Sequence, residues 1–330
     1  MASPLTLTRV WRILKEVDLE AIRREAGRRL RILVIGEDTA DADALAIRLA
    51  EGGGDPTRWL TAIDAPLAAP AAGAAAEPAG PVVDGPDVVI TVLRSSGQSD
   101  AMKAARHVWA SRRVRLLTVV VGGSEGAGSV TTEGDTARVA VAGLDAEGIQ
   151  CVVDGLVGIV EPDRRIALAR QIPLTRPKVF NALIEETART NAGYSFSTGL
   201  AEVVPILDIP LNIGDMLVLT KNQLMMSYRI ALAAGKTGRP REMIAEIVGV
   251  LGGGLVFRQL ARQLVGLVPV IGIVPKVAVA YGGTWAIGKA VVAWATGGGR
   301  LSADRLKQLS REGMARGRKV AQAFKTGTEL

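Results

Sequence analysis

The sequence predicts an α/β domain with a parallel sheet of P-loop or Rossmann-like type, followed by an all-α, partly membrane-associated helical domain. Short apolar runs alternate with helix-like runs through residues 31–160, as in parallel sheets covered by helices. The runs 88–93 and 116–121 are continuously apolar, which is typical of strands buried on both faces. From Arg164 onward this alternation stops, and long apolar helices are expected instead.

The change of pattern near residue 162 gives the expected organisation, which has four segments. These are a basic amphipathic helix in 1–30, an α/β domain in 31–162, an apolar helical domain in 163–299 with a hairpin near 263–298, and a basic C-terminal helix or tail in 300–330. In the first segment, Val10, Leu14, Val17 and Ala21 recur at helical spacing. That helix either packs on its own domain or binds a membrane surface or a partner.

Strands and helices of the α/β domain follow from the same patterns. We expect strands at 31–35, 57–63, 87–93, 115–121 and 138–142, and helices at 39–51, 98–111 and 147–160.

A phosphate-binding loop is the first candidate site, because the strand ending at Ile35 is followed by Gly36 and a helix-like run. Aligned with Gly-x-x-x-x-Gly-Lys-Ser/Thr, the turn has Asp41 for the second glycine, Ala42 for the lysine and Asp43 for the hydroxyl. The lysine that would reach the β- and γ-phosphates is therefore absent.

Four carboxylates surround this degenerate loop, namely Glu37, Asp38, Asp41 and Asp43. Two unit charges about 4 Å apart interact by about 4 kcal/mol at an effective dielectric constant of about 20. A polyphosphate would therefore be repelled, and no nucleotide cofactor is predicted. Acidic residues also suit a helix start, which explains the cluster without a bound Mg²⁺ or Ca²⁺.

A guanine-reading Asn-Lys-x-Asp is also missing after the strand that ends at Val121, where the chain reads Gly-Gly-Ser-Glu. These absences favour a protein that is not an enzyme. Residues 137–160, "ARVAVAGLDAEGIQCVVDGLVGIV", nevertheless resemble the last strand and helix of Era-like GTPases in pattern. A plain α/β domain with an acidic turn stays open as an alternative.

Two segments of the helical half, 191–235 and 258–299, resemble a bacterial helical domain of unknown function that is fused to, or encoded beside, Era-like GTPases. The matching features are Pro205, Pro210, Asp215, Gln223, the Met225-Met226 pair, "LVPVIG" and "YGGTWAIGKA". The resemblance implies a membrane-associated GTPase-like protein, or a divergent relative without GTPase activity. It supplies no catalytic residues.

Asp215 and Gln223 form a second candidate site. Asp215 reads as an N-cap or first-turn acid of an apolar helix, and Gln223 shares its face. Either the two residues belong to a cap and a core, or they form a functional polar cluster.

The hairpin near 263–298 is long enough to cross a bilayer if Lys276 and Lys289 are tolerated near the membrane. We expect Pro269, Pro275 and the Gly282-Gly283 pair to break or kink the helices, which suits a short hairpin or re-entrant unit as well as two spans. A soluble buried bundle stays open. The basic ends fit a cytoplasmic leaflet with anionic lipids, since 300–330 have eight Lys/Arg and three Asp/Glu.

Composition argues against several further classes of function. One cysteine, Cys151, and one histidine, His107, argue against a disulfide framework, a zinc site or a Cys/His catalytic pair, so no metal is predicted. Aromatic residues make up 4% of the chain, without the interleaving with basic residues that is typical of nucleic-acid binding.

These observations predict a non-enzymatic, membrane-associated, pseudo-GTPase-like scaffold or regulatory module. Its expected partners are the cytoplasmic side of the inner membrane and either a GTPase or a second copy of the chain. The cytoplasm is the alternative location. Two other functions stay open: an active nucleotide hydrolase with unusual ligands, and a soluble regulatory partner of a GTPase.

Overall fold

The computed structural model describes residues 14–15, 17–37, 39–64, 85–94, 98–112, 114–122, 128–201, 211–252, 273–297 and 301–326. The chain divides into two compact units. The α/β unit is Arg24–Val179, and the helical unit is Met1–Arg23 together with Phe180–Leu330. The division between Val179 and Phe180 lies later in the chain than the change of pattern near residue 162.

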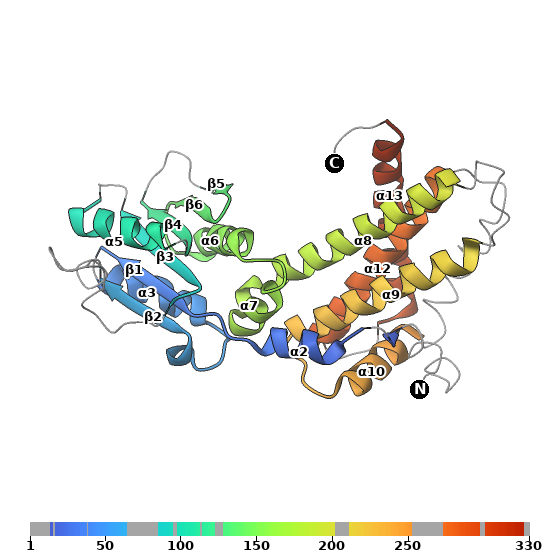
Figure 1. The fold of residues 1–330 in the computed structure, drawn as a ribbon, viewed down its shortest axis with the longest axis horizontal. Helices are drawn as coiled ribbons and strands as arrows, with labels where there is room; N and C mark the ends of the chain where they lie inside the picture. The colour runs from blue at the N-terminus through green and yellow to red at the C-terminus, as the bar shows by residue number, and fades with distance from the viewer. Residues whose placement is uncertain are drawn as a thin grey trace. The chain divides into compact units, whose positions relative to one another are not determined.

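The α/β unit is built on a six-stranded sheet with the order β2-β1-β3-β4-β6-β5 (Figure 1). Its strands are β1 (Ile32–Gly36), β2 (Leu60–Asp64), β3 (Val88–Arg94), β4 (Arg115–Val121), β5 (Val130–Glu133) and β6 (Thr136–Val141). All neighbouring strands are parallel except β5 and β6. The predicted α/β domain with a largely parallel sheet is confirmed.

Strand β5 is absent from the sequence-based expectation because all four of its residues are exposed, so it has no apolar pattern. It forms by antiparallel pairing with β6, in a register that places Val130 opposite Val139 and Thr131 opposite Arg138.

Helices cover the sheet on both faces. Those that contact its strands are α3 (Thr39–Ala50), α5 (Asp100–Ser111) and α6 (Ala146–Ile159). The chain also forms α2 (Leu19–Gly27), α7 (Arg165–Gln171) and the 3₁₀ turns η1 (Pro56–Arg58) and η2 (Pro173–Thr175). Helix α5 buries Met102, Ala105 and Trp109 in a cluster that includes Leu116 of β4. Helix α6 packs through Gly155 on Leu117, the next residue of β4, and therefore lies on the other face.

Helices α5 and α6 both start at side-chain caps. The Ser99 hydroxyl accepts a hydrogen bond from the Met102 N–H at 3.1 Å, and the Asp145 carboxylate accepts one from the Gly148 N–H at 2.9 Å. Each cap satisfies a backbone donor that has no partner within the helix.

Long helices make up the described part of the helical unit, which confirms a helical C-terminal region. They are α8 (Arg176–Ala201), which begins in the α/β unit, and α9 (Leu211–Ala233), α10 (Pro240–Gly252), α12 (Ile273–Gly297) and α13 (Ala303–Thr326). Helix α12 packs against α13, α9 and α10.

Helix α12 is continuous through Gly282-Gly283, so the expected break at this pair is wrong. A Cβ at Gly282 would lie 2.6 Å from the Gly313 carbonyl oxygen of α13. The glycine therefore permits close contact between two helices, and packing offsets its poor helix propensity of about 1 kcal/mol. Pro275 lies in the first turn, where a missing N–H costs no helix bond.

None of the helices in the ranges given above is long and apolar enough to cross a membrane. Residues 263–272, the first limb of the predicted hairpin, lie outside the described residues. The same holds for residues 1–13, so the amphipathic helix expected in 1–30 is described only as α2 (Leu19–Gly27).

Candidate functional site

The fold itself indicates where an α/β sheet of this kind would bind a ligand. Strand order reverses at β1, which lies between β2 and β3. In open α/β sheets, ligands bind outside the carboxyl ends of the strands at such a reversal. Here that place is formed by Gly36 at the end of β1, Glu37, Asp41 of α3 and Arg94 at the end of β3. We call these four residues the switch-point site.

The switch-point site contains an ion pair. The Arg94 Nε donates to Asp41 Oδ2 at 2.9 Å, and Arg94 Nη2 donates to Asp41 Oδ1 at 2.6 Å. Two parallel bonds of this kind are among the stronger interactions of a carboxylate. The Asp41 side chain is 15% exposed, whereas that of Arg94 is 59% exposed. The positive charge of Arg94 is therefore bound by a carboxylate of the protein itself.

Sequence reasoning missed Arg94, and its expectation of an acidic turn without a cation does not describe the folded site. Arg94 is 53 residues from Asp41 in the chain. The available signal was its position as the first charged residue after the apolar run 88–93, because parallel neighbours end at the same sheet edge.

The other acidic positions of the loop lie in different surroundings. Glu37 Oε1 accepts a hydrogen bond from the Ser99 N–H at 3.2 Å, at the start of α5. Asp43 is exposed, and Asp38 lies outside the described residues. Ala42, at the position of the P-loop lysine, is fully buried in the core.

Metal-ligating side chains do not gather in the described part of the chain, where no group of three His, Cys, Asp or Glu residues could hold a metal ion. His107 is exposed on α5, and Cys151 is half-buried on α6.

Gln223 belongs to a polar network between three helices of the helical unit. Asn191 of α8 donates to Thr284 Oγ1 of α12 at 2.9 Å, and Gln223 Nε2 of α9 donates to the same oxygen at 3.1 Å. Asn222 Nδ2 donates to Asn191 Oδ1 at 2.8 Å, and the Thr284 hydroxyl donates to the Ala280 carbonyl at 2.7 Å. Asn191 and Thr284 are fully buried, so the network fixes how the helices pack.

Asp215 is not placed in this network. Helix α9 begins at Leu211, so Asp215 lies beyond the first turn, and the expectation that it caps the helix or lies in that turn is wrong. Its side chain lies outside the described residues.

The two lysines expected to flank a membrane both lie on α12. Lys289 Nζ donates to Asn181 Oδ1 at 2.7 Å and lies 5.5 Å from the centroid of the Trp285 ring. Burial, with Arg316 nearby, lowers the pKa of Lys289. Burial also lowers the pKa of Lys276.

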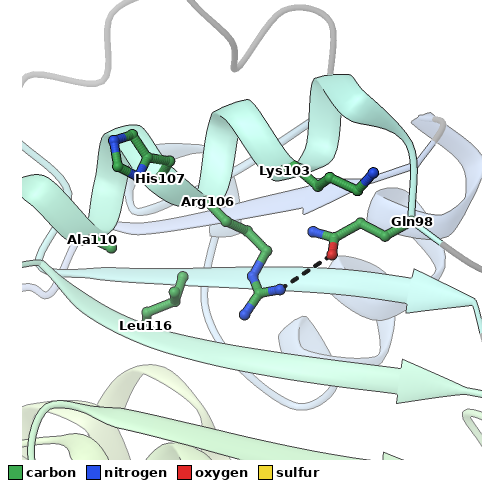
Figure 2. Close-up of a pocket in the computed structure, with 6 residues that line it drawn as sticks. All are labelled: Gln98, Lys103, Arg106, His107, Ala110 and Leu116. Carbon is green, nitrogen blue, oxygen red and sulfur yellow. Dashed lines mark hydrogen bonds between the residues drawn. The ribbon is translucent and has the colours of Figure 1, made fainter.

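A cavity of about 290 Å³ lies along α5, and sequence reasoning missed it. It is lined by Gln98, Lys103, Arg106, His107, Ala110 and Leu116 (Figure 2). Arg106 and Gln98 point toward one another, and Arg106 Nη1 donates to Gln98 Oε1 at 3.4 Å. We call this feature the basic cavity. The sequence signal for this cavity was Lys103, followed three and four residues later on the same helix by Arg106 and His107.

Comparisons with protein-family models, with curated proteins and with solved structures find no match to this chain. The two units and the geometry of their sites are therefore the basis for a functional argument.

Proposed function

We propose that this chain is a non-enzymatic scaffold or regulatory module that attaches to the cytoplasmic face of the inner membrane. In this proposal the α/β unit serves as a docking domain and has the architecture, but not the chemistry, of a nucleotide-binding domain. The proposal rests on one observation: the Asp41–Arg94 ion pair lies at the carboxyl ends of β1 and β3. This is where a phosphate would be expected.

A phosphate at the switch-point site would compete with Asp41 for the Arg94 guanidinium. It would also approach the Asp41 carboxylate, which the folded chain holds in place by two hydrogen bonds. Backbone N–H groups at the start of α3 favour anions, but an exposed helix terminus contributes only about 0.3–1 kcal/mol. This contribution is smaller than the repulsion expected from one carboxylate at contact distance.

Membrane attachment is supported by the exposed side of α13. Its exposed basic residues are Arg305, Lys307, Arg311, Arg316, Arg318, Lys319 and Lys325. Leu309, Val320 and Ala321 of the same helix are buried. A basic side chain near an anionic membrane surface contributes about 1 kcal/mol. Such a helix favours attachment by charge at the surface.

Calorimetry of the full chain with GTP, ATP and Mg²⁺ tests the nucleotide part of this proposal. We expect no saturable binding in the micromolar range by the native protein. Asp41→Asn removes the carboxylate that pairs with Arg94, so this variant should gain weak phosphate binding that the double variant Asp41→Asn, Arg94→Gln lacks. Micromolar binding by the native chain that Arg94→Gln abolishes would overturn the proposal and favour an active nucleotide hydrolase.

A further inference from the structure

We propose that the basic cavity binds the oxyanion of a small metabolite, through a phosphate or carboxylate group held by Arg106 and attracted by the charge of Arg138 on the same face of the sheet. This inference concerns a ligand of the α/β unit and does not depend on the proposed function.

Two buried hydrogen-bond donors of the basic cavity lack an acceptor in the described part of the chain. Arg106 Nε and Gln98 Nε2 are both buried, and neither has a hydrogen-bond partner among the described residues. Buried donors without a partner are costly and call for an explanation such as a bound group. Because both groups are donors, the missing partner is an acceptor.

A second arginine adds its charge to this place. Arg138 of β6 lies beside Thr118 of β4 in the sheet register. Thr118 lies on the same face as Leu116, which packs under α5, so Arg138 also lies on the α5 side of the sheet. Burial, together with the charge of Arg138, lowers the pKa of Arg106.

Arg106 Nη1 donates to the neutral amide of Gln98 rather than to a carboxylate. Lys103, at the rim, already pairs with Asp100 at 2.8 Å. A bound anion would accept from the two unpartnered donors and contact the Arg106 guanidinium, a group that binds carboxylate and phosphate through paired N–H groups. The arrangement therefore suits an oxyanion better than a neutral ligand.

The size and the walls of the basic cavity limit the rest of the ligand. About 290 Å³ is at the lower end of the range for small-molecule sites. Ala110 and Leu116 give it apolar surface for a short carbon chain. A small phosphomonoester or a short dicarboxylate fits these limits, and inorganic phosphate would occupy the anion position alone.

Thermal unfolding and calorimetry of the full chain test the site, with inorganic phosphate, glycerol phosphate and succinate as separate probes in chloride buffer. Inorganic phosphate distinguishes the oxyanion itself from the two carbon-bearing ligands. We expect at least one probe to raise the Tm of the native protein and to bind saturably. Arg106→Gln and Arg138→Gln should each weaken that binding by about tenfold or more.

Arg28→Gln is the matched control, because Arg28 is an exposed arginine of the same unit whose surface pair with Glu25 contributes little. It should bind the probe as the native protein does. Arg138 is exposed, so its variant should fold even if the Arg106 variant does not. In buffer without the probes, Arg106→Gln should keep or raise the Tm, since it removes a charge repulsion and a buried donor.

The inference is overturned if none of the three probes binds the native protein, or if Arg138→Gln and Arg28→Gln bind equally well. Nucleotide binding that Arg106→Gln abolishes and Arg94→Gln preserves would support the basic cavity and leave the switch-point proposal intact. The two proposals can therefore fail separately.

Discussion

Arg94 brings to the switch-point site a positive charge that the sequence-based interpretation of this site did not include. The absent P-loop lysine could be read from the turn that follows β1, since Ala42 takes its place. The cation that does reach this turn comes from the end of β3, and Asp41 binds it through both carboxylate oxygens. The sequence alone shows only the acidic residues of the turn, because the Asp41–Arg94 ion pair depends on how β1 and β3 align in the sheet.

Tyr228 is another residue whose properties depend on its surroundings. It is fully buried in the helical unit, and its hydroxyl donates to the Leu19 carbonyl at 3.4 Å. Burial, with the charge of Glu20 nearby, raises the pKa of Tyr228 to about 12. The folded state therefore holds the phenolic proton more tightly than the unfolded state does.

We predict that Tyr228→Phe reduces the loss of stability at alkaline pH. Because the pKa of Tyr228 is raised in the folded state, its contribution is complete below pH 10 and is lost as the pH rises through about 12. The difference amounts to roughly 2 kcal/mol. Urea unfolding of native protein and variant should show nearly equal stability at neutral pH and a steeper alkaline decline for the native chain. Parallel declines would contradict the prediction.

Helices α12 and α13 meet through small residues, and this is the clearest determinant of packing at the scale of elements. A Cβ at Gly313 would lie 2.3 Å from the Gly282 carbonyl oxygen, and one at Gly317 would lie 2.2 Å from the Ala278 carbonyl oxygen. The backbones are therefore in contact, as in helix pairs that use small residues four apart. The sequence of 300–330 predicted only a basic helix or tail and gave no sign of this contact.

Gly313→Ala and Gly193→Ala form a matched pair that tests this contact. Gly193 lies within α8, and a Cβ there would meet nothing within 4 Å. The alanine should therefore stabilise α8 by up to about 1 kcal/mol. At Gly313 the same change forces the helices apart and should destabilise by about 1–3 kcal/mol. Chemical denaturation measures both, and a stabilising Gly313→Ala would show that the helices are not in close contact.

The strands and helices of the α/β unit could be predicted because each has a local signal. Strand β4 has the predicted bounds, Arg115–Val121, since its apolar run is continuous and has Arg115 at its start. Helix α5 was expected to include 98–111 and is observed as Asp100–Ser111, with Ser99 as its cap. Strand β5 could not be predicted, because an exposed edge strand gains its stability from its neighbour β6.

At the scale of the whole molecule, the formal net charge of +7 favours an anionic partner. Part of this excess lies on the exposed side of α13, while its apolar residues pack inside the helical unit. The proposed attachment should therefore depend on charge, and it should weaken as salt shortens the screening length.

Vesicle sedimentation measures this attachment. We expect the full chain to sediment with vesicles that contain phosphatidylserine, to remain in solution with neutral vesicles, and to be released by high salt. The triple variant Arg311→Gln, Arg318→Gln, Lys319→Gln should bind several-fold less, whereas Arg28→Gln, Arg48→Gln, Arg112→Gln removes the same charge from the α/β unit and should bind as the native chain does. Equal loss in both variants, or no binding at low salt, would contradict surface attachment through α13.

The sequence by itself determined the largely parallel α/β sheet, the helical second half and the missing phosphate-binding lysine, because each is encoded in neighbouring residues. Only the tertiary structure decided which distant groups meet. Examples are Arg94 with Asp41, Arg106 with Gln98 in the basic cavity, and Gly282 against Gly313. Such contacts arise from strand register and helix packing, and these depend on the combined burial of many residues that no local pattern specifies.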